Sequence, residues 1–406
     1  MASRRCEVAV VGGGLAGAAA AIAFAAEGFD TLFAAPAPPE TDRRSTALIG
    51  RSVAFLSGIG VFEAARPRAE ALRSMRLIDD TGRLFKAPTV EFRASEIGVS
   101  AFGYNILNSD LAAALAERVG ALASHLTPVE SRVEDIRFED DHAVLDLGEA
   151  GTWRTQLVVG ADGRRSIARE KAGIAAREWR YPQTALVFNF EHARPHDGVS
   201  NEFHTRTGPF TQVPLPGSRS SLVWVEAPDR ADLYADLKPE RLGAVVEQKL
   251  HSILGAVTVE DSIQGFPLSG LAAAAMSAPR LALVGEAAHA FPPIGAQGLN
   301  LGLRDVEALI SAARNGRDDP GSANVLRRYA QGRLGDVSSR SSGVDLLNRS
   351  LLADFLPVQA ARGLGLGALR NVGFLRHFAM REGISPGAGF TGVPKSVREG
   401  IDGQNA

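Results

Sequence analysis

The sequence predicts an α/β fold, with a mostly antiparallel β-sheet inserted into the α/β part and a helical tail at the C-terminal end. Three observations predict this fold. A short apolar strand runs through a glycine turn into an alanine-rich helix near the N-terminus, and strand-like runs alternate between residues 179 and 226. Residues 348–381 mix Leu, Phe and Val with Arg. At 406 residues the chain is long enough for two to three folding units.

The first element is a buried strand over residues 6–11, which is too short for a helix and is bounded by glycines. The turn after it has the spacing Gly-x-Gly-x-x-Gly and opens a predicted helix over residues 18–27. Glycines at this spacing allow a tight turn, close approach of a pyrophosphate and close helix–strand packing. A plain glycine turn is the alternative, but the strand before it and the helix after it favour a dinucleotide site. The turn consists of Gly12, Gly13, Gly14, Leu15, Ala16 and Gly17.

The second strand, residues 31–35, ends where such sites usually carry an acid that binds the adenosine ribose, about 20 residues after the glycines. Ala35 stands there instead. Either the ribose contact is absent, or Glu40 or Asp42 from the following Pro-rich loop replaces it. We therefore expect weakened retention of a dinucleotide.

Two later motifs lie at the ends of buried strands. Residues 157–166 run from a strand into Asp162-Gly163 and a basic turn, a pattern that an ordinary Asx turn and helix cap also explain. Residues 281–302 are longer and rarer: a strand ends at Glu286, and a Pro- and Gly-rich stretch leads to Gln297-Gly298-Leu299-Asn300. A carboxylate at a strand end can accept hydrogen bonds from sugar-chain hydroxyls, and a helix N-terminus can face an anion.

Taken in order, these motifs resemble the single-component FAD-dependent aromatic hydroxylases of the para-hydroxybenzoate hydroxylase fold. More narrowly, the chain resembles the ubiquinone-biosynthesis branch, the polyprenylphenol and 2-polyprenyl-6-methoxyphenol hydroxylases. The residues that carry the resemblance are the glycine turn, Asp162-Gly163, and the run from Gly285 to Asn300. Supporting segments are residues 42–48 (Asp-x-Arg-x-x-Ala-Leu), Gly103-Tyr104, Asn108-Ser109 and residues 346–350.

The resemblance implies a Rossmann-like FAD-binding domain and roles for its motif residues. Gly12, Gly14 and Gly17 would meet the FAD pyrophosphate, and Arg44 and Asn108 would lie along the adenosine side. Asp162 and Gly163 would lie near the pyrophosphate and the route of the nicotinamide, and Glu286 would hold the ribityl chain in place of the more usual Asp. The cofactor-binding residues expected around the flavin ring are Pro293, Gly295, Gln297, Gly298, Leu299 and Asn300.

The activity implied by the resemblance is ring hydroxylation of a prenylated phenol in ubiquinone biosynthesis. NAD(P)H would reduce FAD, O2 would form a flavin hydroperoxide, and its distal oxygen would pass to the phenol. Because the cofactor carries this chemistry, no catalytic side chain is assigned. His289 is either a base that makes a phenolate or a histidine that fixes a strand end, and the motif favours the second role.

Other functions stay open. A related FAD hydroxylase could act on a small soluble phenol, or a flavin reductase on prenyl double bonds. A non-catalytic accessory subunit of a quinone-synthesis assembly is the non-enzymatic alternative. The sequence does not fix the ring position, the prenyl length, the choice of NADH or NADPH, or the oligomeric state, which could be a homodimer.

The alternating runs between residues 179 and 226 predict an antiparallel sheet over the flavin. The expected FAD-binding domain is discontinuous, with residues 1–75, 100–178 and 275–345, and the substrate domain takes 76–99 and 179–274. Side chains of this sheet either line an apolar substrate cavity or form plain core. The side chains in question are Phe188, Phe190, Val213, Leu215 and Trp224.

The C-terminal region, residues 346–406, is expected to be helical. Its apolar and basic residues suit either contact with an anionic membrane or a partner, or a helix packed on the FAD-binding domain. Three glycines at 363, 365 and 367 weaken a continuous membrane helix, which favours the packed helix. A quinone-synthesis assembly is the expected partner if the tail docks on protein.

Composition limits the other classes of function. The formal net charge is −2, so the chain has no basic field for nucleic acid. One cysteine, Cys6, excludes an internal disulfide framework and an all-thiolate metal site. The uncharged run 8–26 is broken by glycines and is read as strand, turn and helix rather than a signal peptide or a membrane span. A cytoplasmic location is expected, with the inner face of the membrane as a peripheral contact.

Overall fold

A computed structural model describes residues 4–37, 42–82, 86–260, 263–292, 297–336, 365 and 367–403. Its first layer is a parallel sheet with the strand order β8-β2-β1-β11-β19, extended at one edge by the antiparallel strand β18. The strands are β1 (Arg4–Val11), β2 (Thr31–Ala35), β8 (Leu126–Glu130), β11 (Thr152–Gly160), β18 (Ser277–Ala278) and β19 (Leu281–Leu283). The strands β9 (Asp135–Phe138) and β10 (Ala143–Asp146) extend β11 antiparallel.

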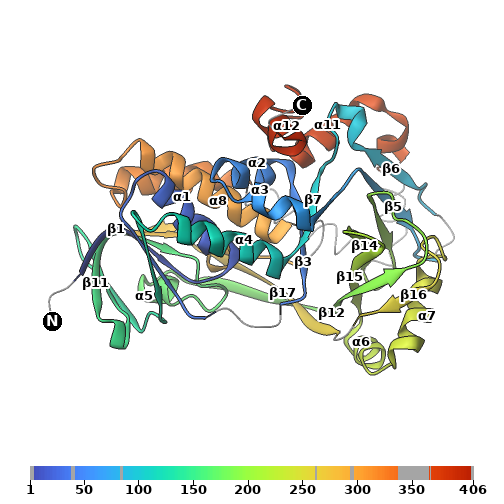
Figure 1. Cartoon of the computed structure of the whole chain (residues 1–406), viewed down its shortest axis with the longest axis horizontal. Helices are drawn as coiled ribbons and strands as arrows, with labels where there is room; N and C mark the ends of the chain where they lie inside the picture. Colours follow the sequence, from blue (N-terminus) through green and yellow to red (C-terminus); the bar gives the residue numbers. More distant parts are fainter. Residues whose placement is uncertain are drawn as a thin grey trace.

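Helix α1 (Leu15–Ala26) packs on this sheet, and α4 (Asn108–Ala121) and α8 (Gln297–Arg314) lie beside it (Figure 1). Helix α1 is buried from Gly17 to Ala25, because its many alanines let it approach the strands closely. The short helix α5 (Ile167–Lys171) packs on β9 and β11. The predicted helix start at residue 18 was three residues late, since Gly14 is the N-cap and the first turn lies inside the glycine motif.

The second layer is the sheet β20-β17-β12-β15-β14-β13-β5-β6, with β16 also paired to β12. All its pairs are antiparallel except β13 with β5. Its strands are β5 (Ser74–Asp79), β6 (Val90–Arg93), β12 (Ala176–His192), β13 (Val199–His204), β14 (Pro209–Leu215), β15 (Arg219–Glu226), β16 (Val257–Val259), β17 (Gln264–Ala273) and β20 (His289–Ala290). The inserted antiparallel sheet predicted from residues 179–226 is confirmed.

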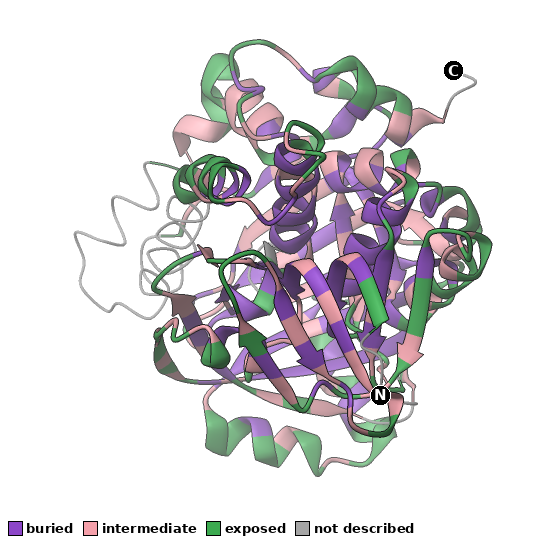
Figure 2. Ribbon diagram, turned by 90° about the vertical axis from the view of Figure 1, so that its left-hand side faces the viewer, coloured by how far each residue is buried: buried purple, intermediate pink, exposed green. Residues whose placement is uncertain are grey.

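One face of the second sheet is covered by α6 (Pro228–Ala235) and α7 (Pro239–Lys249). A small sheet, β3-β7-β4, connects the two large ones. Its strands are β3 (Ser45–Ile49), β4 (Ala69–Ala71) and β7 (Gly103–Leu107), and it is flanked by α2 (Gly50–Gly58) and α3 (Phe62–Ala65). Figure 2 shows buried residues concentrated in the central helices and strands, with exposed residues on the outer helices.

A further helix covers residues 323–336, before the C-terminal region. In the described part of residues 346–406, the helices α11 (Gly373–Ile384) and α12 (Lys395–Asp402) are joined by turns over residues 385–394. Helix α12 lies against α2: Gly400 faces Ala54, and a Cβ at Gly50 would meet Ile384, Val397 and Ile401. Helix α12 therefore packs on α2, whereas residues 346–364 of the tail lie outside the described residues. Residues 346–350 and Gly363, singled out in the sequence, lie outside the described residues. No helix in the described ranges combines the length and the apolar character needed to span a bilayer.

Candidate functional site

The predicted glycine turn lies at the carboxyl edge of the parallel sheet, between β1 and α1. Gly12 has φ +114°, and a Cβ there would overlap the carbonyl group of Ala161, which directly follows β11. A Cβ at Gly17 would overlap the carbonyl oxygen of Gly12. Both positions therefore require glycine for packing alone.

Gly13 and Gly14 differ, because both are exposed at the surface of the turn. Nothing lies within 4 Å of a Cβ built at Gly14, the N-cap of α1. The first turn of α1 has no acidic residue, and no side chain caps its N–H groups. Free N–H groups and the positive end of a helix, on an open glycine surface, fit a phosphate.

Asp162 lies beside this turn, because the Ala161 N–H donates to the carbonyl oxygen of Val11 at 2.8 Å. Its Oδ2 accepts from the Ala168 N–H at 3.1 Å, which fixes the side chain against α5. Its Oδ1 is buried and has no hydrogen-bond partner among the described residues. A buried acceptor without a partner is costly, so the side chain has capacity for a ligand donor.

Glu286 follows β19 in a short turn, η4 (Gly285–Ala287). Gly285 has φ +59°, and a Cβ there would lie 3.5 Å from the Ala16 Cβ, so this turn meets the start of α1. The Glu286 side chain is 58% exposed, and its nearest cation is Arg164, whose Nε lies 3.9 Å from Oε2. The carboxylate is thus largely exposed, and among the described residues it has one long ion pair.

Arg44, Asp42 and Asn108 form a cluster where residues 42–44 pass between the two large sheets. Asp42 accepts from Arg44 Nη2 at 2.7 Å and from Asn108 Nδ2 at 3.0 Å. Burial opposes ionisation of Asp42, but these hydrogen bonds outweigh it and hold the pKa of the carboxyl below its usual value. The guanidinium of Arg44 also lies over the Phe266 ring of β17, 5.4 Å from its centroid.

Helix α8 begins at Gln297, as predicted for the Gln-Gly-x-Asn run. Gly298 is exposed, and a Cβ there would meet nothing within 4 Å. Asn300 is buried and clamps β3, since its Oδ1 accepts from the Ile49 N–H at 2.9 Å and its Nδ2 donates to the Ala47 carbonyl at 2.7 Å. Leu299 packs against the main core. Pro293 and Gly295 lie outside the described residues.

A buried ionic network beneath this edge was missed by the sequence reasoning. His289 Nε2 lies 2.7 Å from Asp305 Oδ2, which also accepts from the Gly285 N–H at 3.0 Å. Arg333 Nε donates to Asp305 Oδ1 at 2.7 Å. Burial of Asp305 alone would raise its pKa, but His289 and Arg333 outweigh burial and lower it. The signal in the sequence that could have revealed this network was Asp305, an acid on a face of α8 that otherwise packs into the core.

His289 is thus 3% exposed and joined to Asp305, in agreement with the histidine that fixes a strand end. Its ring stacks on Phe291 with centroids 5.6 Å apart. Cys6 is also buried, and burial raises the pKa of its thiol to about 12, as expected of an inert core cysteine.

The two faces of the second sheet differ in what covers them. Phe188, Phe190 and Trp224 belong to the core under α6 and α7. Alternation places Val213 and Ser221 on the opposite face, where Ser221 Oγ lies 2.6 Å from Ser45 Oγ of β3. Val213 and Val223 on that face are only half-buried. The three aromatic side chains are therefore plain core, and the opposite face turns toward the cluster at Arg44.

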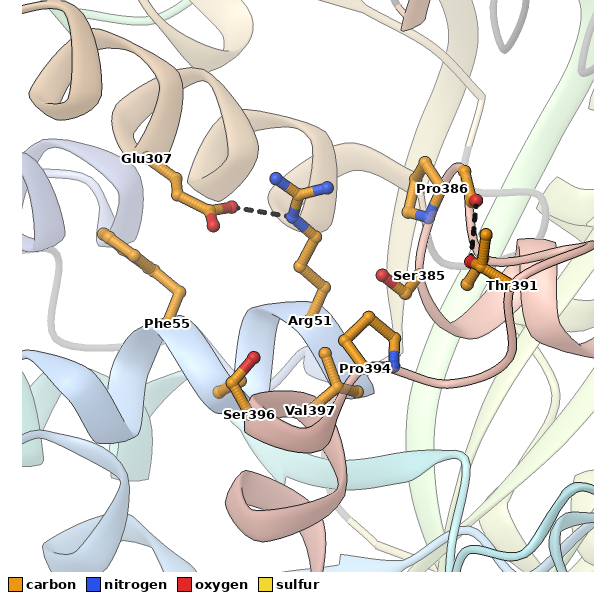
Figure 3. A pocket seen from close by; sticks show the side chains of 12 residues that line it. Arg51, Phe55, Glu307, Ser385, Pro386, Thr391, Pro394, Ser396 and Val397 are labelled. Carbon is orange, nitrogen blue, oxygen red and sulfur yellow. Dashed lines mark hydrogen bonds and ion pairs between the residues drawn. The ribbon is translucent and has the colours of Figure 1, made fainter.

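A separate cavity of about 430 Å³ lies between α2, α8 and the C-terminal helices (Figure 3). Arg51 in its wall donates to Glu307 at 2.9 Å, and apolar lining comes from Phe55, Pro394 and Val397. None of the predicted site residues lines it.

Comparisons with known proteins agree on one family. A family model described as an FAD-binding domain matches residues 5–337. The ubiquinone hydroxylase UbiL of Rhodospirillum rubrum is 35% identical over 94% of this chain and 90% of its own length. The 3-demethoxyubiquinol 3-hydroxylase of Escherichia coli is 33% identical over 94% of this chain and 99% of its own.

Among solved structures, the p-nitrophenol 4-monooxygenase of Pseudomonas putida superposes with a TM-score of 0.76 at 21% identity. The match covers 96% of this chain and 100% of the other. At that identity the likeness supports the fold alone.

Proposed function

The chain belongs to the FAD-dependent aromatic monooxygenase family that includes the ubiquinone hydroxylases, and on this premise we propose that it hydroxylates the aromatic ring of a prenylated phenol in ubiquinone biosynthesis. The reductant is NAD(P)H and the oxidant is O2. The observation that carries the proposal is identity above 30% with two hydroxylases of ubiquinone compounds, over 94% of this chain in each case.

In this proposal FAD binds along the carboxyl edge of the parallel sheet and supplies the reduction and oxygen-activation chemistry. The pyrophosphate lies against Gly13, Gly14 and the N-terminus of α1. Asp162 accepts through its free Oδ1, and the exposed carboxylate of Glu286 accepts from ribityl hydroxyls. The buried network of His289, Asp305 and Arg333 keeps the Glu286 turn in position.

The phenol then lies against the face of the second sheet opposite α6 and α7, beside the half-buried Val213 and Val223. The predicted substrate stretches, 76–99 and 179–274, form this domain in the proposal. Half-buried valines suit an apolar ring and tail, and they help exclude water from the reaction.

The reaction is tested with purified protein and with a deletion strain. We expect a yellow protein whose NAD(P)H oxidation rises when a prenylated phenol is added, and a deletion strain that accumulates a quinone precursor lacking one hydroxyl. Stimulation by small soluble phenols alone would favour the related hydroxylase. A colourless protein that does not take up added FAD would favour the accessory subunit.

We further propose that the C-terminal region docks on an anionic membrane surface, from which a lipid-tailed phenol can be drawn. Seven large hydrophobic side chains are exposed in the described residues, and four of them lie between residues 372 and 390. Phe374 is 62% and Phe390 77% exposed, and Phe378 joins them with its centroid 4.7 Å from that of Phe390. We call Phe374, Phe378 and Phe390 the aromatic patch.

Charge supports the same partner, because Arg370 beside the aromatic patch is exposed. The double variant Phe374→Asp, Phe390→Asp is expected to lose most of its co-sedimentation with phosphatidylglycerol vesicles. Leu233→Asp, at an equally exposed position on α6, is the control and should bind as the unmodified protein does. Equal binding by all three proteins would contradict the membrane contact.

A homodimer stays a prediction. Sedimentation velocity of the same preparation checks the oligomeric state.

A further inference from the structure

The end of β2 lacks the acid that usually binds an adenosine ribose, and of the two candidates from the following loop only Asp42 lies in the described residues. Ala35 offers only a methyl group there. Both carboxylate oxygens of Asp42 are already hydrogen-bonded, Oδ1 to Arg44 and Oδ2 to Arg44 and Asn108. Glu40 lies outside the described residues.

The neighbouring strand places another acid at the same level of the sheet. In the parallel pairing of β2 with β8, Ala35 is the register partner of Glu130, the last residue of β8. Neighbouring strands are about 4.8 Å apart, and register partners point to the same face of a sheet. The two side chains therefore emerge side by side, although they lie far apart in the sequence.

That face is the one on which the glycine turn lies. A Cβ built at Gly13 would be 2.9 Å from the Ala35 Cβ, so the methyl group of Ala35 points at the turn. Because Ala35 is small, the space beside the turn is open to a longer side chain from the next strand. Glu130 is exposed, and among the described residues its carboxylate has no hydrogen bond or ion pair.

We propose that Glu130 takes the place of the missing acid and accepts hydrogen bonds from the adenosine ribose of FAD. This inference rests on the proposed function, since it needs FAD in the glycine turn. It makes β8, rather than β2, the strand that recognises the adenosine half of the cofactor. The alternative is a solvated glutamate with no ligand.

The test is a titration of the cofactor-free full-length chain with FAD, in which flavin fluorescence reports binding. A second titration in the presence of ADP, as a competitor, measures the affinity for ADP. Glu130→Ala is expected to lower the affinity for FAD and the affinity for ADP about tenfold each, which is the scale of a hydrogen bond to a charged group. Glu117→Ala is the matched control, an exposed glutamate of α4 without a partner in the described part of the chain. The double variant Ala35→Glu, Glu130→Ala should recover most of the affinity, because it returns an acid to the same face.

Unchanged FAD affinity in Glu130→Ala would overturn the assignment, and so would a loss of FAD affinity without a loss of ADP affinity. So would failure of Ala35→Glu to recover affinity in a double variant whose circular dichroism matches that of the unmodified chain. If the unmodified chain itself does not bind FAD, the proposed function fails and this inference fails with it. A chain that binds FAD normally and is indifferent to Glu130 leaves the proposed function standing and refutes the inference alone.

Discussion

Asp305 joins three stretches of the chain through one buried carboxylate. Its oxygens meet His289, the Gly285 N–H and Arg333, and its side chain is fully buried. Removing one partner of such a network leaves the other charges buried without compensation. Because the Glu286 turn lies between two of these contacts, the network would act on the proposed cofactor site through the position of this turn rather than through contact.

Asp305→Asn is therefore expected to lower the free energy of unfolding by about 3–5 kcal/mol. Urea denaturation of the cofactor-free chain measures this loss, and FAD affinity should fall in the same variant because the Glu286 turn loosens. Glu307→Gln is the control, since Glu307 is on the same helix but its ion pair with Arg51 is partly exposed. A change below about 1 kcal/mol in Asp305→Asn would contradict this role.

The pH dependence of the network follows from the lowered pKa of Asp305. A carboxyl with a folded-state pKa below its unfolded value of about 3.9 stabilises the fold above that value. Its contribution is complete at neutral pH and is lost only as the pH falls through the folded-state pKa. Thermal unfolding between pH 7 and pH 5 should therefore show no loss from this group.

Single residues of the site were predictable where the backbone allows one solution. There is no room for a Cβ at Gly12 or Gly17, and the spacing of the glycines in the sequence predicted this tight turn. The Asp305 contacts and the Ala35–Glu130 pair were not predictable, because their partners come from distant parts of the chain and register is a tertiary property.

At the scale of elements, short-range patterns found β1, β2, β11, β19 and the runs of β12, β14 and β15, and β2 has the predicted bounds. They did not find edge strands such as β8 or the small sheet β3-β7-β4. Alternation in β12 and β15 was equally clear, but it could not say which face the helices cover. That choice is made by α6 and α7, which cover the face of Phe188 and Trp224. A periodicity defines two faces, and only packing distinguishes them.

Near its start, helix α11 forms an ion pair with η2 (Ala94–Ile97), the short turn that follows β6 of the second sheet. Arg376 donates to both oxygens of Glu96, at 2.5 and 2.6 Å, and its guanidinium lies over the Phe92 ring. The hydrogen bond from Arg376 lowers the pKa of Glu96, so the pair stabilises the docked helix above the unfolded value of about 4.3. The contribution is lost as the pH falls through the folded-state pKa.

Hydrogen exchange of the α11 amides should accordingly accelerate when the pH is lowered from 6 to 3.5, beyond the intrinsic effect of pH on exchange. The pair is partly exposed, so its contribution is about 0.2–1 kcal/mol. Glu96→Gln should show the faster exchange already at pH 6 and little further change. Glu399→Gln, which removes an exposed pair with Lys395 in α12, serves as the control.

At the scale of the whole molecule, two sheets meet over the segment that carries Arg44. Asn189 of β12 donates to the Arg43 carbonyl at 3.1 Å, and Ser45 contacts Ser221 of β15. The segment therefore ties the carboxyl edge of the parallel sheet to the face of the second sheet opposite α6 and α7. This placement makes the proposed binding of the phenol separable from the proposed binding of FAD, because residues on that face can be changed without touching the glycine turn.

Val213→Trp uses this separation. The larger ring should fill space on the face opposite α6 and α7, so that the KM for a prenylated phenol rises at least about tenfold, or its stimulation of NAD(P)H oxidation disappears. FAD affinity should stay unchanged, since Val213 lies on β14 and the glycine turn on the other sheet. Ile253→Trp, 36% exposed beside the core of α6 and α7, adds the same ring on the covered side and should leave both quantities unaltered. Loss of FAD binding in Val213→Trp would mean that the sheets are coupled, and an unchanged KM would place the phenol elsewhere than on this face.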